Sequence, residues 1–247
     1  MNEERTYRAL AGSGLEAHTM TVGETDLAIY LSPGLWTDAL ARDLQNHIIE
    51  QRRDLQSFIT ELPDFAASHI PLRLGADAPP VARKMAEAAA TAGVGPMAAV
   101  AGFVAESAAA FLAARGAEEV IVENGGDIYI CGKTTRNIGI FAGAENPFSG
   151  KLAIELAAAL LPCAICTSSG TLGSSFSYGR ADAAVVIAGS GALADAAATA
   201  TANAVQSPAD VAKACDQAMA VPGVAAAVVI CGDQLAAAGE IALVPLG

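Results

Sequence analysis

Basic residues are scarce in this sequence. Its 247 residues include 14 Lys and Arg against 26 Asp and Glu, which gives a formal net charge of −12 at pH 7. After Asn137 the basic residues are Lys151, Arg180 and Lys213 alone. Because binding to nucleic acid depends on a basic surface, this charge argues against a nucleic-acid partner. An anionic ligand of the C-terminal part would be held by backbone N–H groups, hydroxyls or a metal ion.

Histidine and cysteine are also few. The three histidines all lie in the first third of the chain, so a Ser-His-Asp or Cys-His arrangement would require one of them to fold across. Five cysteines, an odd number at irregular spacing, do not form a disulfide framework. Cys163 and Cys166 have the spacing of a metal or redox pair, but there is no second pair to complete a zinc site, and their neighbours are typical of a buried strand. We therefore expect reduced thiols packed in the core.

Long apolar runs are absent, although 53% of the residues are hydrophobic. Charged residues interrupt the Ala-rich stretches before any reaches the roughly 18 residues of a membrane span. The first five residues are polar and mostly acidic, unlike a secretory signal. We expect a soluble, cytoplasmic protein with no membrane partner and a substantial buried core.

Hydrophobic periodicity predicts blocks of strands and pairs of helices. Strands are expected at residues 7–10, 15–22, 27–31, 120–123, 128–131, 138–141, 152–156, 183–188, 224–231 and 241–244. Helices are expected at residues 36–62, 81–92, 97–115, 192–205 and 208–219, with Ser190 as an N-cap. A strand-helix-helix-strand pattern occurs twice. This order favours an α+β fold over alternating βαβ units.

Three polar segments interrupt the C-terminal half. Asn124-Gly-Gly-Asp127 lies between two expected strands and is typical of a hairpin turn, but it could also line a ligand site. The segment from Thr167 to Ser175 is rich in hydroxyls, with glycines that let a ligand approach the backbone. It suits a phosphate or pyrophosphate where cations are few, and a flexible loop is the alternative.

Asp195 and Thr199 form the third segment. They stand four residues apart in an Ala-rich helix and therefore share a face. A lone carboxylate there gains nothing from burial, so it is in water, paired or bound to a cation. The two oxygen donors suit Mg²⁺ or Ca²⁺ rather than zinc, and a solvated helix face is the alternative.

In this order the three elements resemble the ApbE superfamily, whose best-known members are FAD:protein FMN transferases. The resemblance implies one α+β domain over residues 1–247 with two structural halves, roughly 1–118 and 119–247. Antiparallel sheets would be covered by paired helices, like a duplicated T-fold. It also implies that Asp195 and Thr199 hold Mg²⁺, which bridges the FAD pyrophosphate as FMN passes to a threonine or serine of a target protein. The residues that match parts of the flavin-nucleotide cleft are Asn124, Gly125, Gly126, Asp127, Thr167, Ser168, Ser169 and Gly170.

The sequence departs from the transferases at two places. Their Lys-Gly-Tyr-like segment corresponds to Ala101-Gly102-Phe103, and their His-Ile-Ile-Asp-Pro-like segment to residues 177–182, so the lysine and the histidine are missing. Arg180 is then a candidate contact for the anion. The segments Val94–Gly102, Val122–Asp127 and Cys166–Gly170 are more similar to an ApbE-like subgroup whose function is not established.

These features give three hypotheses. The first is a protein that binds FAD, FMN or another phosphorylated ligand with Mg²⁺ and, if it is an enzyme, transfers FMN or a related group. The second is a non-catalytic ligand-binding or interaction protein that kept the scaffold. The third is hydrolysis by a nucleophile such as Ser169, which lacks a nearby base. Helices of small residues are also compatible with a homodimer.

Overall fold

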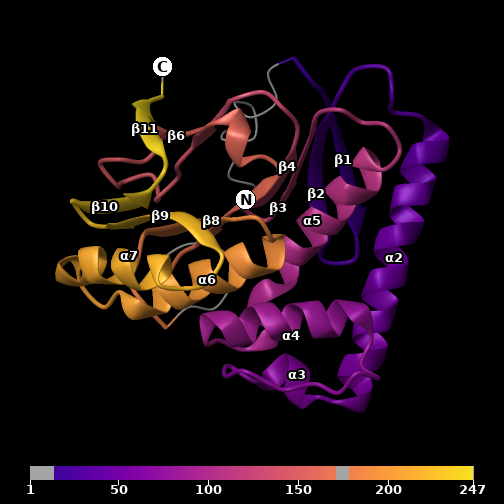
Figure 1. Cartoon of the computed structure of the whole chain (residues 1–247), viewed down its shortest axis with the longest axis horizontal. Coiled ribbons are helices and arrows are strands. Elements are labelled where there is room, and N and C mark those ends of the chain that lie inside the picture. The colour runs from indigo at the N-terminus through magenta and orange to yellow at the C-terminus, as the bar shows by residue number, and fades with distance from the viewer. Residues whose placement is uncertain (1–13, 171–177, 247) are drawn as a thin grey trace.

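A large antiparallel sheet runs through the molecule, with helices on one face and a smaller sheet on the other (Figure 1). The computed structural model describes residues 14–170 and 178–246. Eight described strands form the large sheet in the order β1-β2-β3-β4-β7-β8-β9-β10, and β11-β6-β5 form the small one. The strands are β1 (Glu16–Val22), β2 (Thr25–Leu31), β3 (Val120–Asn124), β4 (Asp127–Cys131), β5 (Arg136–Gly139), β6 (Leu152–Leu156), β7 (Cys163–Ser168), β8 (Ala183–Ala188), β9 (Val224–Cys231), β10 (Gln234–Gly239) and β11 (Ala242–Pro245).

Helices cover one face of the large sheet. They are α2 (Asp38–Glu61), α3 (Asp64–Ala67), α4 (Pro80–Ala92), α5 (Val100–Ala113), α6 (Gly191–Ala204) and α7 (Val211–Met219), with short 3₁₀ turns η1 (Pro96–Ala99) and η3 (Pro208–Asp210). A third 3₁₀ turn, η2 (Ala158–Leu160), lies on the other side, where Leu160 packs against the core between the two sheets. The long helix α2 follows one side of the molecule, and α6 and α7 lie at the opposite side (Figure 1).

Alternating side chains of the sheet build two cores. In β2, Leu27 and Ile29 point toward the helices and pack with Leu44 and Ile48 of α2. Tyr30 points the other way, into the core between the two sheets. Successive residues of a strand face opposite sides, and here both sides are covered, so the central strands are almost continuously apolar.

Two helix starts follow directly from the sequence. The Thr37 hydroxyl accepts a hydrogen bond from the Leu40 N–H at 3.1 Å and caps α2. Pro80 begins α4, where the missing N–H has no intrahelical partner to lose, and Gly93 ends that helix with φ of 79°. These signals explain why the bounds of α2 and α4 lie close to the expected ones.

The α+β fold with antiparallel sheets is confirmed, and β10, α3 and β5 are among the elements that differ from expectation. Strand β10 was not expected because its Ala-rich sequence has low strand propensity, but it pairs with β9 along its whole length. The short helix α3 lies in a stretch expected to be irregular, and β5 begins at Arg136 rather than at residue 138. The expected strand at residues 7–10 lies outside the described residues.

The sheet order bears on the division of the chain. Strands β1 to β4 form one block and β7 to β10 the next, and each block consists of two strands, a set of helices and two further strands. This order groups β3 and β4 with β2, whereas the expected division at residue 118 would separate them. That division stays a prediction.

One helical stretch is more apolar than expected. By length and composition alone, Pro96–Ala113 could cross a membrane, and Glu106 does not interrupt it enough to prevent this. In the fold this stretch is η1 and α5, whose Ala105, Ala108 and Leu112 are buried in the helix-side core. Buried core helices can be equally long and apolar, so this stretch is weak evidence for a membrane span.

Candidate functional site

The Asn-Gly-Gly-Asp segment forms the turn of the β3–β4 hairpin. Asn124 pairs with Asp127, and Gly125 and Gly126 between them have φ of 68° and 110°. Positive φ at both central positions is what a tight hairpin turn requires, so the glycines are needed for the turn itself. The Glu123 carboxylate accepts a hydrogen bond from the Gly126 N–H at 2.7 Å and fixes the turn. The hairpin interpretation is correct, and the same residues also line a cavity.

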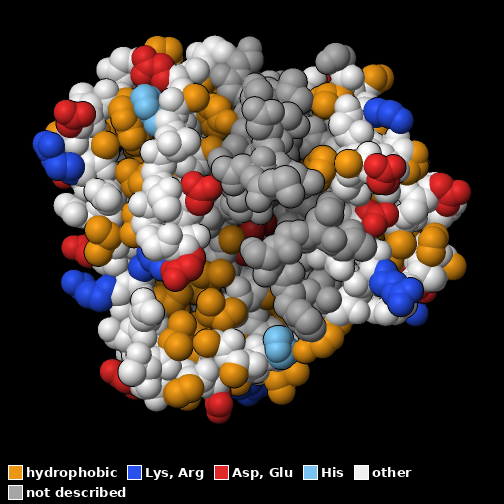
Figure 2. Space-filling model, turned by 180° about the vertical axis from the view of Figure 1, so that it is seen from behind, with side chains coloured by type: hydrophobic (Ala, Val, Ile, Leu, Met, Phe, Trp, Pro, Cys, Tyr) orange, Lys and Arg blue, Asp and Glu red, His pale blue; other side chains and the backbone are white. Residues whose placement is uncertain are grey.

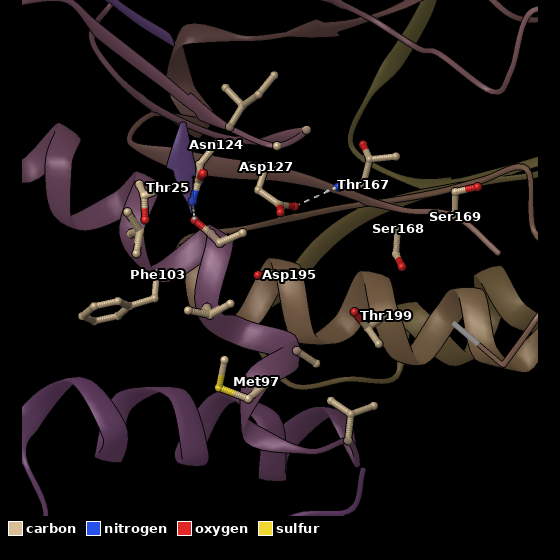
Figure 3. Close-up of a pocket in the computed structure, with 18 of the residues that line it drawn as sticks. Thr25, Met97, Phe103, Asn124, Asp127, Thr167, Ser168, Ser169, Asp195 and Thr199 are labelled. Atoms are coloured by element: carbon tan, nitrogen blue, oxygen red, sulfur yellow. Dashed lines mark hydrogen bonds between the residues drawn. The ribbon is translucent and has the colours of Figure 1, made fainter. Parts of the chain in front are cut away.

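The polar ends of this turn are anchored to neighbouring elements (Figure 3). The Asn124 side-chain amide donates to the Ala101 carbonyl of α5 at 3.2 Å. One Asp127 carboxylate oxygen accepts from the Thr167 N–H of β7 at 3.3 Å. The turn therefore connects the start of α5 to the end of β7.

The hydroxyl-rich segment begins at the end of β7. Thr167 and Ser168 are its last strand residues, and Ser169 donates to the Ala181 carbonyl at 3.4 Å. A Cβ atom at Gly170 would lie 2.1 Å from the Gly179 carbonyl oxygen, so this glycine is required by packing within the chain. The second half of the segment, residues 171–175, lies outside the described residues.

Helix α6 presents a polar stripe to the same place. Asp195 and Thr199 lie one turn apart and both point toward the strand ends, as Figure 3 shows. Asn203, one further turn along, also lines the cavity. The expectation that Asp195 and Thr199 share a face follows from helix geometry and holds in the structure.

Asp195 has a structural partner that the sequence did not reveal. Its carboxylate accepts a hydrogen bond from the Gly102 N–H in the first turn of α5 at 2.9 Å. The N-cap residue of α5, Ala99, has no side chain able to do this. A carboxylate at a helix N-terminus satisfies an open N–H group and favours the helix dipole.

The opposite arrangement occurs at the start of α6. There the Glu106 carboxylate of α5 accepts from the Gly191 N–H at 2.7 Å and from the Ser190 hydroxyl at 3.2 Å. Ser190 occupies the N-cap position as expected, but its side chain makes no capping hydrogen bond to the helix. Each helix is thus capped by a carboxylate of the other.

Close contact of the two helix backbones makes these reciprocal caps possible. A Cβ at Gly102 would lie 2.1 Å from the Gly191 carbonyl oxygen, and a Cβ at Gly191 would lie 2.2 Å from the Gly102 oxygen. Any side chain at either position would push the helices apart. Gly102, which corresponds to the glycine of the transferases' Lys-Gly-Tyr-like segment, is therefore part of a tight helix crossing.

These segments surround one cavity of about 1130 Å³. From behind, the surface is hollowed near its centre, and an acidic side chain is visible within the hollow (Figure 2). Arg52 of α2 is the one cation among the described lining residues, and it contacts Glu24 and the Thr25 hydroxyl. Of the expected site residues, those that line the cavity are Asn124, Gly125, Gly126, Asp127, Thr167, Ser168, Ser169, Asp195 and Thr199. Gly170 and the exposed Arg180 are not among its described lining residues.

The surroundings of Asp127 and Asp195 in this cavity disfavour the charged form of both carboxyl groups. Burial raises the pKa of Asp127 to about 7, and the negative charge of Glu123 adds to the rise, while the Thr167 N–H opposes it. Burial and the neighbouring Asp127 hold the pKa of Asp195 well above its ordinary value, although the Gly102 N–H favours the charged form. Both groups would ionise more readily beside a cation.

These shifts in pKa predict a pH dependence of stability. The native pKa of Asp127 exceeds its ordinary value of 3.8, so between these values the native state binds more protons than the unfolded state. The free energy of unfolding contributed by Asp127 should therefore fall as pH rises from 4 toward 7, by roughly 1.4 kcal/mol for each unit of difference. Urea unfolding in EDTA at several pH values, compared with Asp127→Asn, measures this contribution. An unchanged difference between the two proteins across that range would contradict it.

The Cys163-x-x-Cys166 pair is not a chelating or redox site. Because the spacing is odd, the two side chains lie on opposite faces of β7, Cys163 between the sheets and Cys166 toward the helices. Burial raises the pKa of the Cys163 thiol to about 12. Both thiols pack in the core, as expected.

Several residues that line the cavity were not predicted from the sequence, and His69 and Tyr178 are two of them. His69, in the segment expected to be irregular, lines the cavity together with Tyr178. Nothing in the local sequence around His69 signals this, because its position depends on the close packing of Gly95 against the Ser68 carbonyl. Among the described residues, no group of three or more His, Cys, Asp or Glu side chains is placed to hold a metal ion.

Comparisons with known proteins agree on one group. The model of the family described as "AbpE bacteria" matches residues 8–237. The "UPF0280 protein" of Methanocella arvoryzae is 43% identical over 194 residues, which cover 78% of each chain. The protein of the same description from Methanopyrus kandleri is 39% identical over 185 residues, 74% of this chain and 72% of the relative.

Solved structures show the same fold at low sequence identity. The flavin transferase ApbE of Vibrio cholerae matches with a TM-score of 0.54 and 16% identity, over 92% of this chain and 98% of the other. The apo flavinyl transferase ApbE of Pseudomonas stutzeri matches with a TM-score of 0.55 and 15% identity, over 91% and 93% of the two chains. At 15–16% sequence identity, these matches show that the fold is shared.

Proposed function

The chain belongs to the family described as AbpE bacteria, and from this premise we propose that it binds a flavin nucleotide, or another ligand with a diphosphate, together with Mg²⁺. The ligand occupies the cavity lined by Asn124–Asp127, Thr167–Ser169, Asp195 and Thr199. If the protein is an enzyme, it transfers FMN or a related phosphoryl-linked group.

The meeting of three separate polar segments at one cavity carries this proposal. With about 1130 Å³, the cavity slightly exceeds the roughly 300–1,000 Å³ of most small-molecule sites and can hold a dinucleotide. The hydroxyls of Thr167, Ser168 and Thr199 make no hydrogen bond to another described residue, so they can donate to phosphate oxygens.

A cation is needed because the cavity is acidic. Asp127 and Asp195 face a space whose one described cation, Arg52, is already paired with Glu24. A diphosphate there would meet two carboxylates unless a metal ion lies between them. Asp195 and Thr199 would hold Mg²⁺, and because the described residues offer no larger cluster, phosphate oxygens and water would complete its ligands. Such a bound ion neutralises charge that develops on the phosphates.

Incubation of the purified protein with FAD, with Mg²⁺ or with EDTA, tests the proposal. We expect FAD to remain bound after gel filtration only with Mg²⁺. AMP release that depends on Mg²⁺ would support the transferase form. Absence of FAD, FMN and ADP binding under both conditions would contradict the proposal.

A binding protein without transfer activity is the second candidate. The helix crossing at Gly102 leaves no room for a side chain there, and the preceding residue is Ala101 rather than the lysine of the transferases. Tight FAD binding without AMP release would favour this form. A cytoplasmic location and a homodimer stay predictions.

A further inference from the structure

Two aromatic rings from distant parts of the chain meet at the cavity. The imidazole of His69 and the ring of Tyr178 have centroids 5.5 Å apart and planes at 82°. Both residues line the cavity, and Tyr178 is 57% exposed. The other two histidines also contact rings, His18 on Trp36 and His47 on Phe111, but neither lines this cavity.

The backbones that carry these rings are anchored. The Tyr178 N–H donates to the Asn203 side-chain oxygen at 2.8 Å, and the Gln206 amide donates to the Tyr178 carbonyl at 3.3 Å. On the other side, a Cβ at Gly95 would lie 1.9 Å from the Ser68 carbonyl oxygen, so the backbone next to His69 rests directly on the turn before α5. Backbone contacts therefore hold the two segments that carry the rings of His69 and Tyr178.

The position of these two rings along α6 fits a nucleotide. Asp195, Thr199 and Asn203 lie at successive turns on the cavity side of the helix. Eight residues of helix span about 12 Å, so Asn203, which holds Tyr178, lies about that far along the axis from Asp195. A ligand with its phosphates near Asp195 and Thr199 and its ring one sugar away would reach these two rings.

We propose that His69 and Tyr178 bind the planar heteroaromatic ring of the phosphorylated ligand, either adenine or isoalloxazine. Two perpendicular rings let a planar ligand stack on the face of one and meet the edge of the other. Stacking also requires no cation, which suits this acidic cavity. This inference rests on the proposed function, because phosphates bound near Asp195 and Thr199 would place the ligand's ring beside His69 and Tyr178.

Affinities of Tyr178 variants test the ring site. In Mg²⁺, Tyr178→Ala should weaken ADP or FMN binding roughly tenfold, as loss of one stacking partner does elsewhere, while Tyr178→Phe retains binding. Inorganic pyrophosphate should bind equally to all three proteins. The nucleotide that loses affinity identifies the ring, adenine for ADP and isoalloxazine for FMN. Equal loss for pyrophosphate, or no loss for either nucleotide, would overturn the inference.

A phosphate-free probe separates this inference from the proposed function. The chain has three histidines, so the signal lost in His69→Phe identifies the His69 imidazole and leaves the other two to His18 and His47. Adenosine, or riboflavin in nearly saturated solution, should shift the His69 signal and leave those of His18 and His47 in place. A His69 shift without any nucleotide or FAD binding in Mg²⁺ would contradict the proposed function alone. No shift with either nucleoside would overturn the ring site.

Discussion

Replacing Gly102 with alanine is expected to lower the free energy of unfolding by about 3 to 5 kcal/mol. The new Cβ would lie 2.1 Å from the Gly191 carbonyl oxygen, and backbone cannot move aside as a flexible side chain can. Separation of α5 from α6 would also weaken both reciprocal caps, Gly102 to Asp195 and Gly191 to Glu106. Urea unfolding at pH 7 measures the loss.

Gly189 offers a matched control just before α6. A Cβ there meets no atom within 4 Å, so Gly189→Ala should change stability by less than about 0.5 kcal/mol. Equal stability of the Gly102→Ala and Gly189→Ala variants would show that the close helix crossing does not matter to the fold.

Asp195→Asn is expected to have opposite effects on ligand binding and on stability. It should weaken Mg²⁺-dependent FAD binding at least about 100-fold, since loss of outer partners alone costs metal sites 10–100-fold. Without ligand, the same variant should be more stable at pH 8, because burial and Asp127 oppose the Asp195 charge. The amide oxygen can still accept from Gly102 N–H, so the cap of α5 is retained. Calorimetric titration and urea unfolding measure the two effects.

Two further variants make this result specific. Asp216→Asn removes an exposed carboxylate from α7 and should change neither quantity. Thr199→Val should weaken Mg²⁺-dependent binding, while Thr199→Ser keeps the hydroxyl and should retain it. Unchanged FAD affinity in Asp195→Asn would mean that this carboxylate serves α5 alone.

Residue patterns within single segments predicted most helices and strands, and they predicted the polar segments that line the cavity. Helical spacing placed Asp195 and Thr199 on one face, and the two glycines after Asn124 identified a hairpin turn. Strand β10 was missed because its pairing with β9 overrides a weak propensity.

What could not be predicted depends on contacts between distant residues. The Gly102 N–H that satisfies Asp195 comes from a helix 93 positions earlier, so the sequence left only water, a paired charge or a cation as explanations. The contribution of His69 to the cavity depends likewise on Gly95 and on Tyr178. Periodicity within one segment carries no information about either contact.

A crystal structure of the protein with ADP or FAD and Mn²⁺ in place of Mg²⁺ would show whether a metal ion joins Asp195 to the diphosphate. We expect an anomalous Mn²⁺ peak bonded to Asp195, Thr199 and diphosphate oxygens, at roughly the 2.0–2.1 Å of Mg²⁺ sites or slightly longer. The phosphates should also lie beside Thr167 and Ser168. A fully occupied nucleotide with its phosphates elsewhere, or without a metal ion at Asp195, would show that this cavity is not a Mg²⁺-diphosphate site.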